Sequence, residues 1–375
     1  MNYKLKIGLN ATCLNDRPSG AKQRFVGIYG ELIKRLPNAE FVVYEPSDCR
    51  VGAWFCGAQN VSARETSISS DGGRAAKLIA GLRYWHTALD RDNFDFFEGF
   101  HMPLVRAPTG RTLLTVHDIR SINPEYGALS LAVFKTFLGR SIRAADHLVV
   151  VSETVKNEIL NLYPGVPISV IYNGLDPRGF DKVTASDILK FCHKFAIPDG
   201  FILAVGHFEG RKNYLRLIEA MSLLRDRGRS CPLLIIGNDS GERRAIEERV
   251  KSLNLSGTVQ ILSDLSDLEV RCAYKLCDLF IFPSSYEGFG IPILEAMAAG
   301  RPMVLSDIQV FQEITENQGI YFPYDDIELM ASAIEEGLSS SSERDRLVSY
   351  GNERVKAFSF QALAGQLEHL YRALM

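Results

Sequence analysis

The chain has 375 residues, 46% of them hydrophobic and 23% charged, and a formal net charge of −3. The length favours two domains over one core, and the composition is globular. No apolar run approaches the roughly 20 residues of a membrane-spanning helix. The seven cysteines include no C-x-x-C pair and the N-terminus lacks a signal-peptide pattern, so we expect reduced thiols and a cytoplasmic protein.

The charge is divided unevenly along the chain. Residues 1–175 carry 20 Lys and Arg against 16 Asp and Glu, whereas residues 176–375 carry 22 against 29. A more basic first half favours an anionic partner such as a lipid phosphate or a membrane surface. The alternative is a chance imbalance among exposed side chains. We expect no nucleic-acid partner.

Short β-rich runs alternate with helical patterns along the whole chain. Strands are expected at residues 5–9, 41–44, 94–98, 112–116, 147–151, 168–171, 201–205, 233–236, 259–262, 279–282 and 303–305. Helices are expected at residues 24–36, 73–89, 129–144, 153–162, 214–225, 243–253, 268–276, 293–299 and 327–338. This alternation occurs twice and predicts two parallel sheets wound on both faces. The polar segment 173–179, with two glycines and a proline, is the expected hinge.

Two glutamates, Glu287 and Glu295, stand eight positions apart after the apolar run at 279–282. Eight residues is a little over two helical turns, so both carboxylates can face one side if the turn continues into a helix. Open α/β sheets bind ligands at the carboxyl ends of their strands, and carboxylates accept hydrogen bonds from sugar hydroxyls. Gly288 and Gly290 let backbone N–H groups approach a ligand. The pattern favours a nucleotide-sugar site over a solvated surface turn.

A second Gly-bearing turn at residues 206–213 (GHFEGRKN) follows the first strand of the second half and opens a helix. This turn is typical of an anion site and contains Gly206, Arg211 and Lys212. A helix N-terminus supplies N–H donors, and the Arg and Lys side chains bind phosphate. The alternative is a solvated basic helix start, although cations oppose the helix dipole at that end.

The first half offers weaker candidates. Ser19 is a plausible N-cap, and Gly20 beside it would let a ligand approach the backbone. His117 ends the expected strand at 112–116, where it would face a ligand, or else form a structural pair with Asp118. His101 lies in a loop and is a weaker candidate of the same kind.

Two other patterns are interpreted as structural. The D-x-D run at residues 90–92 is expected to be plain loop, so we expect no metal and no other cofactor. The expected helix at 73–89 has an apolar stripe that suits a membrane surface, but more commonly packs on a sheet.

In this order along the chain, these residues resemble glycosyltransferase family 4, the retaining, metal-independent enzymes of the GT-B fold, in its bacterial polysaccharide form. The resemblance covers nearly the whole chain. It includes Gly20, Val116-His117-Asp118, Val151-Ser152-Glu153, Ile171-Tyr172-Asn173-Gly174, Gly206 with Arg211-Lys212-Asn213, Glu287 to Glu295, and Ala299-Gly300-Arg301-Pro302. It departs at residues 21–24, where many relatives are more glycine-rich.

The resemblance implies two Rossmann-like, doubly wound parallel-sheet domains that face each other across a cleft. Residues 1–175 would form the acceptor domain, with a C-terminal helix at 358–375 crossing back to it. Residues 176–357 would form the nucleotide-sugar donor domain.

The resemblance also implies a role for each candidate. Arg211 and Lys212 would hold the donor diphosphate near Gly206, and Glu295 would hold the ribose hydroxyls. The hydroxyls of the transferred sugar would be held by Glu287 and by the backbone N–H groups of Phe289, Gly290 and Ile291. His117 would lie beside that sugar, and Gly20 would let the first domain close over the phosphates.

The implied reaction moves a hexose, with retention, from a nucleotide-sugar to a saccharide or lipid-linked saccharide acceptor in polysaccharide or O-antigen-type synthesis. GDP-mannose is the favoured donor because of the form of residues 287–292 (EGFGIP), and UDP-hexoses remain open. The enzyme would work in the cytoplasm, with peripheral contact at the inner membrane surface. A nucleotide-sugar epimerase and a non-catalytic binding relative are the alternatives.

Overall fold

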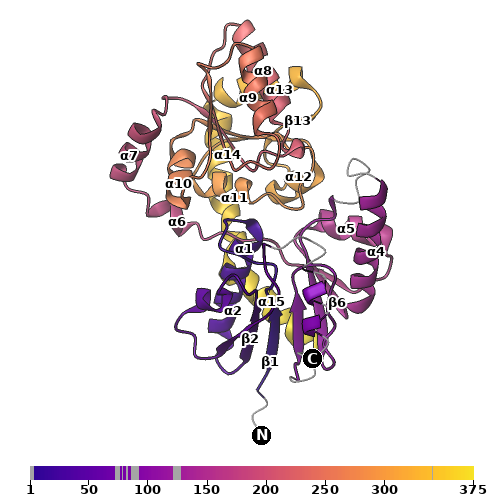
Figure 1. The fold of residues 1–375 in the computed structure, drawn as a ribbon. Coiled ribbons are helices and arrows are strands. Elements are labelled where there is room, and N and C mark those ends of the chain that lie inside the picture. Colours follow the sequence, from indigo (N-terminus) through magenta and orange to yellow (C-terminus); the bar gives the residue numbers. More distant parts are fainter. Residues whose placement is uncertain are drawn as a thin grey trace. The chain divides into compact units, whose positions relative to one another are not determined.

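The computed structural model describes residues 4–71, 77, 79–81, 83–85, 93–120, 128–339 and 341–375, with residues 128–132 described by their backbone alone. The chain divides into two compact units (Figure 1). Unit 1 comprises Met1–Gly174 and Phe360–Met375, and unit 2 comprises Leu175–Ser359. Each unit contains one parallel sheet, so the predicted α/β class with two parallel sheets is confirmed.

Unit 1 contains a seven-stranded sheet in the order β3-β2-β1-β4-β5-β6-β7. The strands are β1 (Lys6–Asn10), β2 (Glu40–Glu45), β3 (Val61–Glu65), β4 (Phe96–Gly99), β5 (Arg111–Val116), β6 (His147–Val150) and β7 (Ile168–Val170). The helices are α1 (Gly20–Arg24), the π-helical turn η1 (Phe25–Tyr29), α2 (Gly30–Arg35), the 3-10 turn η2 (Val51–Phe55), α4 (Ala128–Ala144), α5 (Glu153–Leu162) and α15 (Phe360–Leu374).

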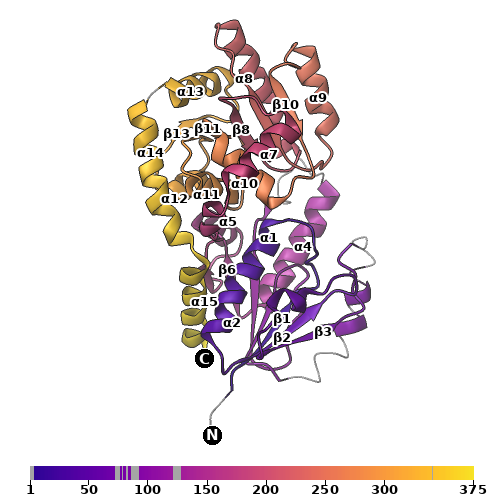
Figure 2. The ribbon, with the colours of Figure 1, turned by 90° about the vertical axis from the view of Figure 1, so that its left-hand side faces the viewer.

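The C-terminal helix α15 is part of the unit 1 core, and it lies beside α2 (Figures 1 and 2). Its Leu363, Ala364, Leu367 and Tyr371 are buried with the residues of β1, β2 and η1. The Tyr371 ring stacks on Phe96 of β4 at 4.6 Å, and its hydroxyl donates to the buried carboxylate of Glu98 at 2.8 Å. Thr115 of β5 also donates to Glu98, so one carboxylate joins α15 to two strands.

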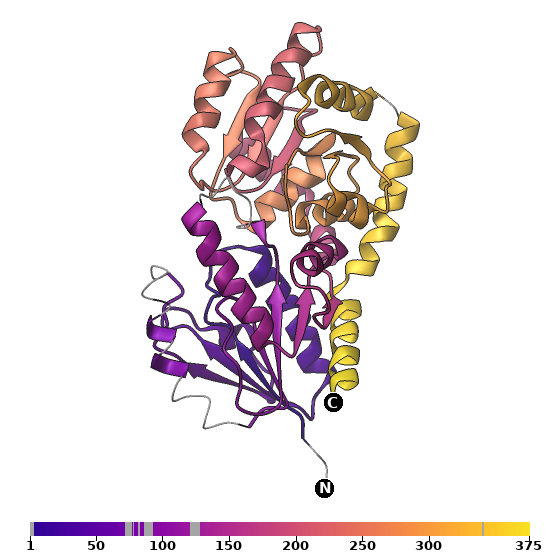
Figure 3. The ribbon, with the colours of Figure 1, turned by 90° about the vertical axis from the view of Figure 1, so that its right-hand side faces the viewer.

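Unit 2 contains a six-stranded sheet in the order β10-β9-β8-β11-β12-β13. The strands are β8 (Ile202–Val205), β9 (Leu233–Ile236), β10 (Val259–Leu262), β11 (Leu279–Phe282), β12 (Met303–Ser306) and β13 (Ile320–Phe322). The helices are α6 (Arg178–Asp181), α7 (Ala185–Phe195), the turn η6 (Gly210–Lys212), α8 (Tyr214–Asp226), α9 (Arg243–Ser252), α10 (Asp267–Leu276), α11 (Ile291–Ala298), α12 (Gln309–Thr315), α13 (Ile327–Ser339), α14 (Ser341–Arg354) and the turn η7 (Val355–Phe358). Figure 3 shows α14 and α15 in yellow as the last two long helices of the chain.

The strands of unit 2 are short apolar runs because helices cover both faces of a parallel sheet. Every residue of β9, β11 and β12 is buried. Local signals set the helix starts: Ser266 caps α10, and Glu269 completes a capping box with it. Because all the strands are parallel, the loops that follow β8 and β11 emerge at the same edge of the sheet.

Several expectations differ in detail from the structure. The helix expected at 24–36 begins earlier, at Gly20, and is interrupted by the π-helical turn η1. The edge strand β3 and the short strand β13 were not predicted. The helix expected at 73–89 lies mostly outside the described residues, and the D-x-D run at 90–92 lies wholly outside them.

All seven cysteines are free thiols. In the described part of the chain, no helix combines the length and the apolar character that a membrane crossing requires.

Candidate functional site

The turn after β8 is built around Gly206. A Cβ atom there would come within 3.0 Å of the Lys212 Cε and 3.1 Å of the Tyr214 hydroxyl. The Tyr214 hydroxyl donates to the Gly206 carbonyl at 3.0 Å. Glycine is favoured at 206 because its φ of 154° is one that residues with a side chain rarely adopt, and because the Lys212 side chain packs on the backbone there.

Lys212 and Arg211 both bind the carboxylate of Glu287. The Lys212 Nζ and an Arg211 guanidinium nitrogen each lie 2.6 Å from Glu287 Oε1, and the Ser284 hydroxyl donates to the same oxygen at 3.0 Å. Arg211 also binds Glu209 at 2.8 Å. The cluster joins the turn after β8 to the turn after β11, and it contains two cations and two carboxylates.

The cluster is largely removed from water. Lys212 is 6% exposed, and its ammonium lies 4.6 Å from the centre of the Phe282 ring. Burial lowers the pKa of Lys212, and the charge of Glu287 opposes that effect. Burial by itself would raise the pKa of Glu287, but the charges of Lys212 and Arg211 outweigh it and hold the pKa low. Glu287 is therefore an anion shared by the buried Lys212 and the partly buried Arg211, and Arg211 has Glu209 as its second carboxylate partner.

The segment between Glu287 and Glu295 is a turn followed by a helix, not one continuous helix. Gly290 precedes α11 with a φ of 126°, which favours glycine, and α11 begins at Ile291. The two carboxylates have separate partners, because Glu295 accepts from the Tyr274 hydroxyl at 2.9 Å. Burial raises the pKa of Glu295. The prediction of a glycine-bearing turn with Glu287, followed by a helix with Glu295, is therefore confirmed.

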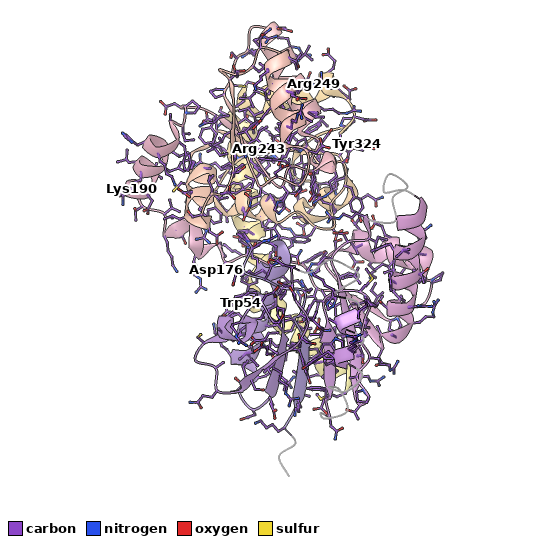
Figure 4. The ribbon with its side chains drawn as sticks, in the orientation of Figure 1. Trp54, Asp176, Lys190, Arg243, Arg249 and Tyr324 are labelled. Carbon is purple, nitrogen blue, oxygen red and sulfur yellow. The ribbon has the colours of Figure 1, made fainter. Side chains whose placement is uncertain are left out.

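Neighbouring strand ends of unit 2 are joined by hydrogen bonds. Arg243, at the start of α9 (Figure 4), donates to the Ser263 hydroxyl at 2.7 Å, and that hydroxyl donates to the Gly237 carbonyl at 2.8 Å. A Cβ atom on Gly237 would lie 1.9 Å from the Gly206 carbonyl oxygen. The loops after β8, β9 and β10 thus form one connected edge.

In unit 1, Gly20 is the first residue of α1, and the Ser19 side chain caps the helix by accepting from the Lys22 N–H at 3.2 Å. The buried Arg24 ends α1. Its guanidinium donates to the Ile171 carbonyl at 2.8 Å, to the Tyr172 carbonyl, and to the Asn173 side chain at 3.3 Å.

His117 directly follows β5 and is a neutral imidazole. Burial, together with the charge of Arg24, lowers its pKa to about 3. Asp118 accepts from the Arg120 N–H at 3.2 Å and forms an ion pair with the Arg120 side chain at 3.7 Å, so Arg120 is a partner of this aspartate.

His101 follows β4, and burial followed by the charge of Lys77 lowers its pKa to about 4. Its Nδ1 is buried and has no hydrogen-bond partner.

The structure therefore brings Arg211, Lys212 and Glu287 into one cluster beside Gly206, at the carboxyl edge of the unit 2 sheet. Sequence reasoning missed Ser284, Tyr274 and Arg24. Ser284 carried a weak signal because it lies within the turn after β11, but the other two are distant in sequence from the groups they contact. Within the residues that the structure describes, no three His, Cys, Asp or Glu side chains are grouped as metal ligands.

Two protein families match this chain. Residues 55–178 match the family described as Glycosyltransferase Family 4, and residues 187–354 match the family described as Glycosyl transferases group 1.

Among curated proteins, the O-antigen chain mannosyltransferase RfbU of Salmonella typhimurium is 32% identical over 62% of this chain and 61% of its own length. The O-antigen chain mannosyltransferase B of Escherichia coli is 28% identical over 93% of this chain and 96% of its own length.

Solved structures show the same fold at low identity. WaaG, a glycosyltransferase of lipopolysaccharide biosynthesis, has a TM-score of 0.74 and 18% identity over 97% of this chain and 99% of its own. Anabaena HepE, solved with UDP and glucose, has a TM-score of 0.76 and 17% identity over 98% of this chain and 100% of its own. The predicted GT-B fold is confirmed.

The low pKa of His117 predicts how stability depends on pH. Between about pH 3 and 6.5 the unfolded chain binds a proton at this histidine and the folded chain does not, so stability falls as the pH falls. Going from pH 7.5 to pH 5.0, wild type should lose at most about 2 kcal/mol through this group. Denaturant unfolding of His117→Gln at both pH values should show a smaller loss of unfolding free energy than in wild type. His369 provides the control because its side chain is exposed. His369→Gln should lose as much stability as wild type over the same pH change.

Proposed function

Because the chain belongs to the glycosyltransferases, with a Family 4 domain followed by a group 1 domain, we propose that it transfers a hexose from a nucleotide-sugar to a saccharide acceptor. The prediction of a glycosyltransferase is confirmed by this membership. The donor, the stereochemistry, the acceptor and the residue roles are parts of the proposal.

The cluster of Arg211, Lys212 and Glu287 carries the proposal. When a nucleoside diphosphate leaves a sugar, negative charge develops on its phosphate oxygens. Two preorganised cations in a largely water-excluded turn can stabilise that charge without moving. Arg211 offers a planar fork for two phosphate oxygens, and Lys212 offers a compact charge.

Glu287 links the phosphate side of the site to the sugar. All three of its contacts converge on Oε1, so they do not use Oε2. In the proposed complex Oε2 accepts from hydroxyls of the transferred hexose, next to the N–H groups of Phe289, Gly290 and Ile291. Glu295 accepts from the ribose hydroxyls while Tyr274 holds one of its oxygens.

The first unit contributes His117 and Gly20 to the proposed reaction. A histidine with a pKa near 3 is neutral at pH 7, so His117 would contact the sugar by hydrogen bonding and not as an imidazolium acid. Gly20, at the capped start of α1, would approach the phosphates through its backbone.

The proposed chemistry is a front-face displacement with retention. The acceptor hydroxyl would attack the anomeric carbon on the face from which the diphosphate departs. The departing phosphate oxygen would take the hydroxyl proton, and no metal ion would take part because Arg211 and Lys212 supply the positive charge.

The mannosyltransferase names of the relatives support GDP-mannose as the donor and an O-antigen-type saccharide, free or lipid-linked, as the acceptor. An acceptor of this kind would be met at the cytoplasmic face of a membrane by peripheral contact.

A nucleotide screen tests the donor. GDP at about 100 times its dissociation constant should raise the free energy of unfolding by about 2.7 kcal/mol, and UDP at the same concentration should raise it less. The measurement is thermal unfolding with GDP, UDP, ADP and their sugars. A larger shift with UDP would replace the proposed donor by a UDP-hexose.

Removing either cation should slow the reaction strongly. Lys212→Ala and Arg211→Ala should each lower the rate of GDP release from GDP-mannose by about 10²–10³-fold, because each removes one preorganised contact to the developing charge. Arg244→Ala is the matched control: this arginine of unit 2 pairs with Glu248 on an exposed helix surface and should change the rate less than about twofold. Rates near wild type in both cation variants would rule out the phosphate role.

Activity should survive chelation. GDP release from GDP-mannose in excess EDTA should match the untreated rate, since the proposed charge stabilisation comes from side chains. Loss of activity in EDTA with recovery on adding Mn²⁺ or Mg²⁺ would show a metal requirement.

A further inference from the structure

The turn after β11, which is proposed to bind the donor, contacts the C-terminal end of unit 2. Phe289, two residues after Glu287, is 3% exposed, and its ring meets the ring of Phe358 at 5.9 Å in an edge-to-face arrangement. Phe358 is fully buried and ends η7, one residue before the chain leaves unit 2. Phe289, whose N–H group is proposed to bind the donor sugar, therefore packs directly on the segment by which the chain leaves unit 2.

Phe358 also holds the segment by which the chain enters unit 2. Leu175, the first residue of the unit, donates its N–H to the Phe358 carbonyl at 3.0 Å, and Leu175 pairs with Ser359 in a parallel bridge. The two connecting segments, residues 173–176 and 356–360, are thus bonded to each other at one point. Asp176, labelled in Figure 4, marks the end of the first.

Phe358 also contacts Arg354. The Arg354 guanidinium lies 4.7 Å from the centre of the Phe358 ring, donates to the Ile314 carbonyl at 2.9 Å and pairs with Glu316 at 3.0 Å. A fully buried ring that contacts both a guanidinium and Phe289 has little freedom to change rotamer, so a shift of Phe289 would be passed on to the backbone of Phe358.

In unit 1, the region that begins at Gly20 also contacts both connecting segments. The helix that begins at Gly20 holds one connecting segment through Arg24, which donates to residues 171–173. One turn later, Gly27 meets the other segment, because a Cβ atom at 27 would lie 2.3 Å from the ring of Phe360. Phe360 is the first residue of the chain on its return to unit 1.

We propose that the connecting segments respond to nucleotide occupancy through these contacts, with Phe358 in unit 2 and Arg24 and Gly27 in unit 1 as positioning residues. The inference deepens the proposed function and rests on it. A ligand on the amides of residues 289–291 would restrain Phe289, and through the Phe289–Phe358 contact it would restrain residues 173–176 and 356–360. Weakening this contact should therefore reduce the effect of the ligand on the two segments.

Hydrogen exchange measured by mass spectrometry, with and without GDP and in parallel with UDP, tests the proposal. In wild type, the nucleotide should slow exchange in residues 206–213 and 287–295, and also at least threefold in residues 356–360. In Phe358→Leu, protection of 206–213 should remain and protection of 356–360 should be lost. The GDP dissociation constant should stay within about fivefold of wild type.

Phe191→Leu is the matched control. Phe191 is an equally buried phenylalanine of unit 2 that packs on Phe195 within α7. This variant should keep the wild-type protection of residues 206–213 and 356–360. It therefore separates a general loss of stability from a specific loss of coupling.

A second pair of variants covers the case in which Phe358→Leu does not fold. Gly27→Ala must displace Phe360, whereas a Cβ atom on Gly30 would meet nothing within 4 Å. Gly27→Ala should reduce the nucleotide-dependent protection of 356–360, and Gly30→Ala should leave it unchanged.

The outcomes separate the two levels of the proposal. If the nucleotide protects 206–213 in wild type but leaves 356–360 unchanged, or if Phe358→Leu behaves like Phe191→Leu, the coupling is overturned and the proposed function stands. If neither GDP nor UDP protects 206–213, the proposed function fails and the coupling fails with it.

Discussion

The ion pairs of Glu287 with Arg211 and Lys212 are the interaction on which the ligand edge of unit 2 depends. A buried ammonium without a partner would cost several kcal/mol, so the turn after β8 needs the carboxylate from the turn after β11 in order to form. The same carboxylate competes with any diphosphate for the two cations. In the proposed complex, binding of the donor exchanges one anion for another at the two cations. A ligand that also gives Glu287 new hydrogen-bond donors would therefore be favoured. A nucleotide-sugar would offer the hydroxyls of its sugar for this purpose, in addition to its diphosphate.

Crowding at this edge favours glycine at two positions. The Lys212 side chain packs on Gly206, and a Cβ atom on Gly237 would lie 1.9 Å from the Gly206 carbonyl oxygen. The parallel sheet creates this crowding, because neighbouring strands deliver their loops to one edge. The crowding keeps the cations preorganised and limits the water around them, and both conditions strengthen an electrostatic contact.

The fold class and the glycine-bearing turns could be predicted from the sequence. The hydrogen-bond and ion-pair partners of the side chains in those turns could not. Apolar runs such as β11 and β12 are visible because both faces of a parallel sheet are covered. The edge strand β3 (VSARE) was missed because its mostly exposed side chains give no apolar signal. The ion pairs of Glu287 involve residues about 75 positions away, and no local pattern specifies such a pairing. The roles of these residues in binding a donor are still predictions.

Arg24 shows how one buried charge links separate features of unit 1. Its guanidinium donates to the carbonyls of Ile171 and Tyr172, and its charge helps keep His117 neutral. A buried guanidinium is tolerated where carbonyl oxygens accept hydrogen bonds from it and a carboxylate lies nearby, and here that carboxylate is Glu98. Glu98 in turn binds Tyr371 of α15. The return of the chain to unit 1 therefore brings a hydroxyl that donates to Glu98, the carboxylate whose charge acts on Arg24. One buried network in unit 1 therefore joins α15, through Tyr371 and Glu98, to the guanidinium that holds residues 171–173.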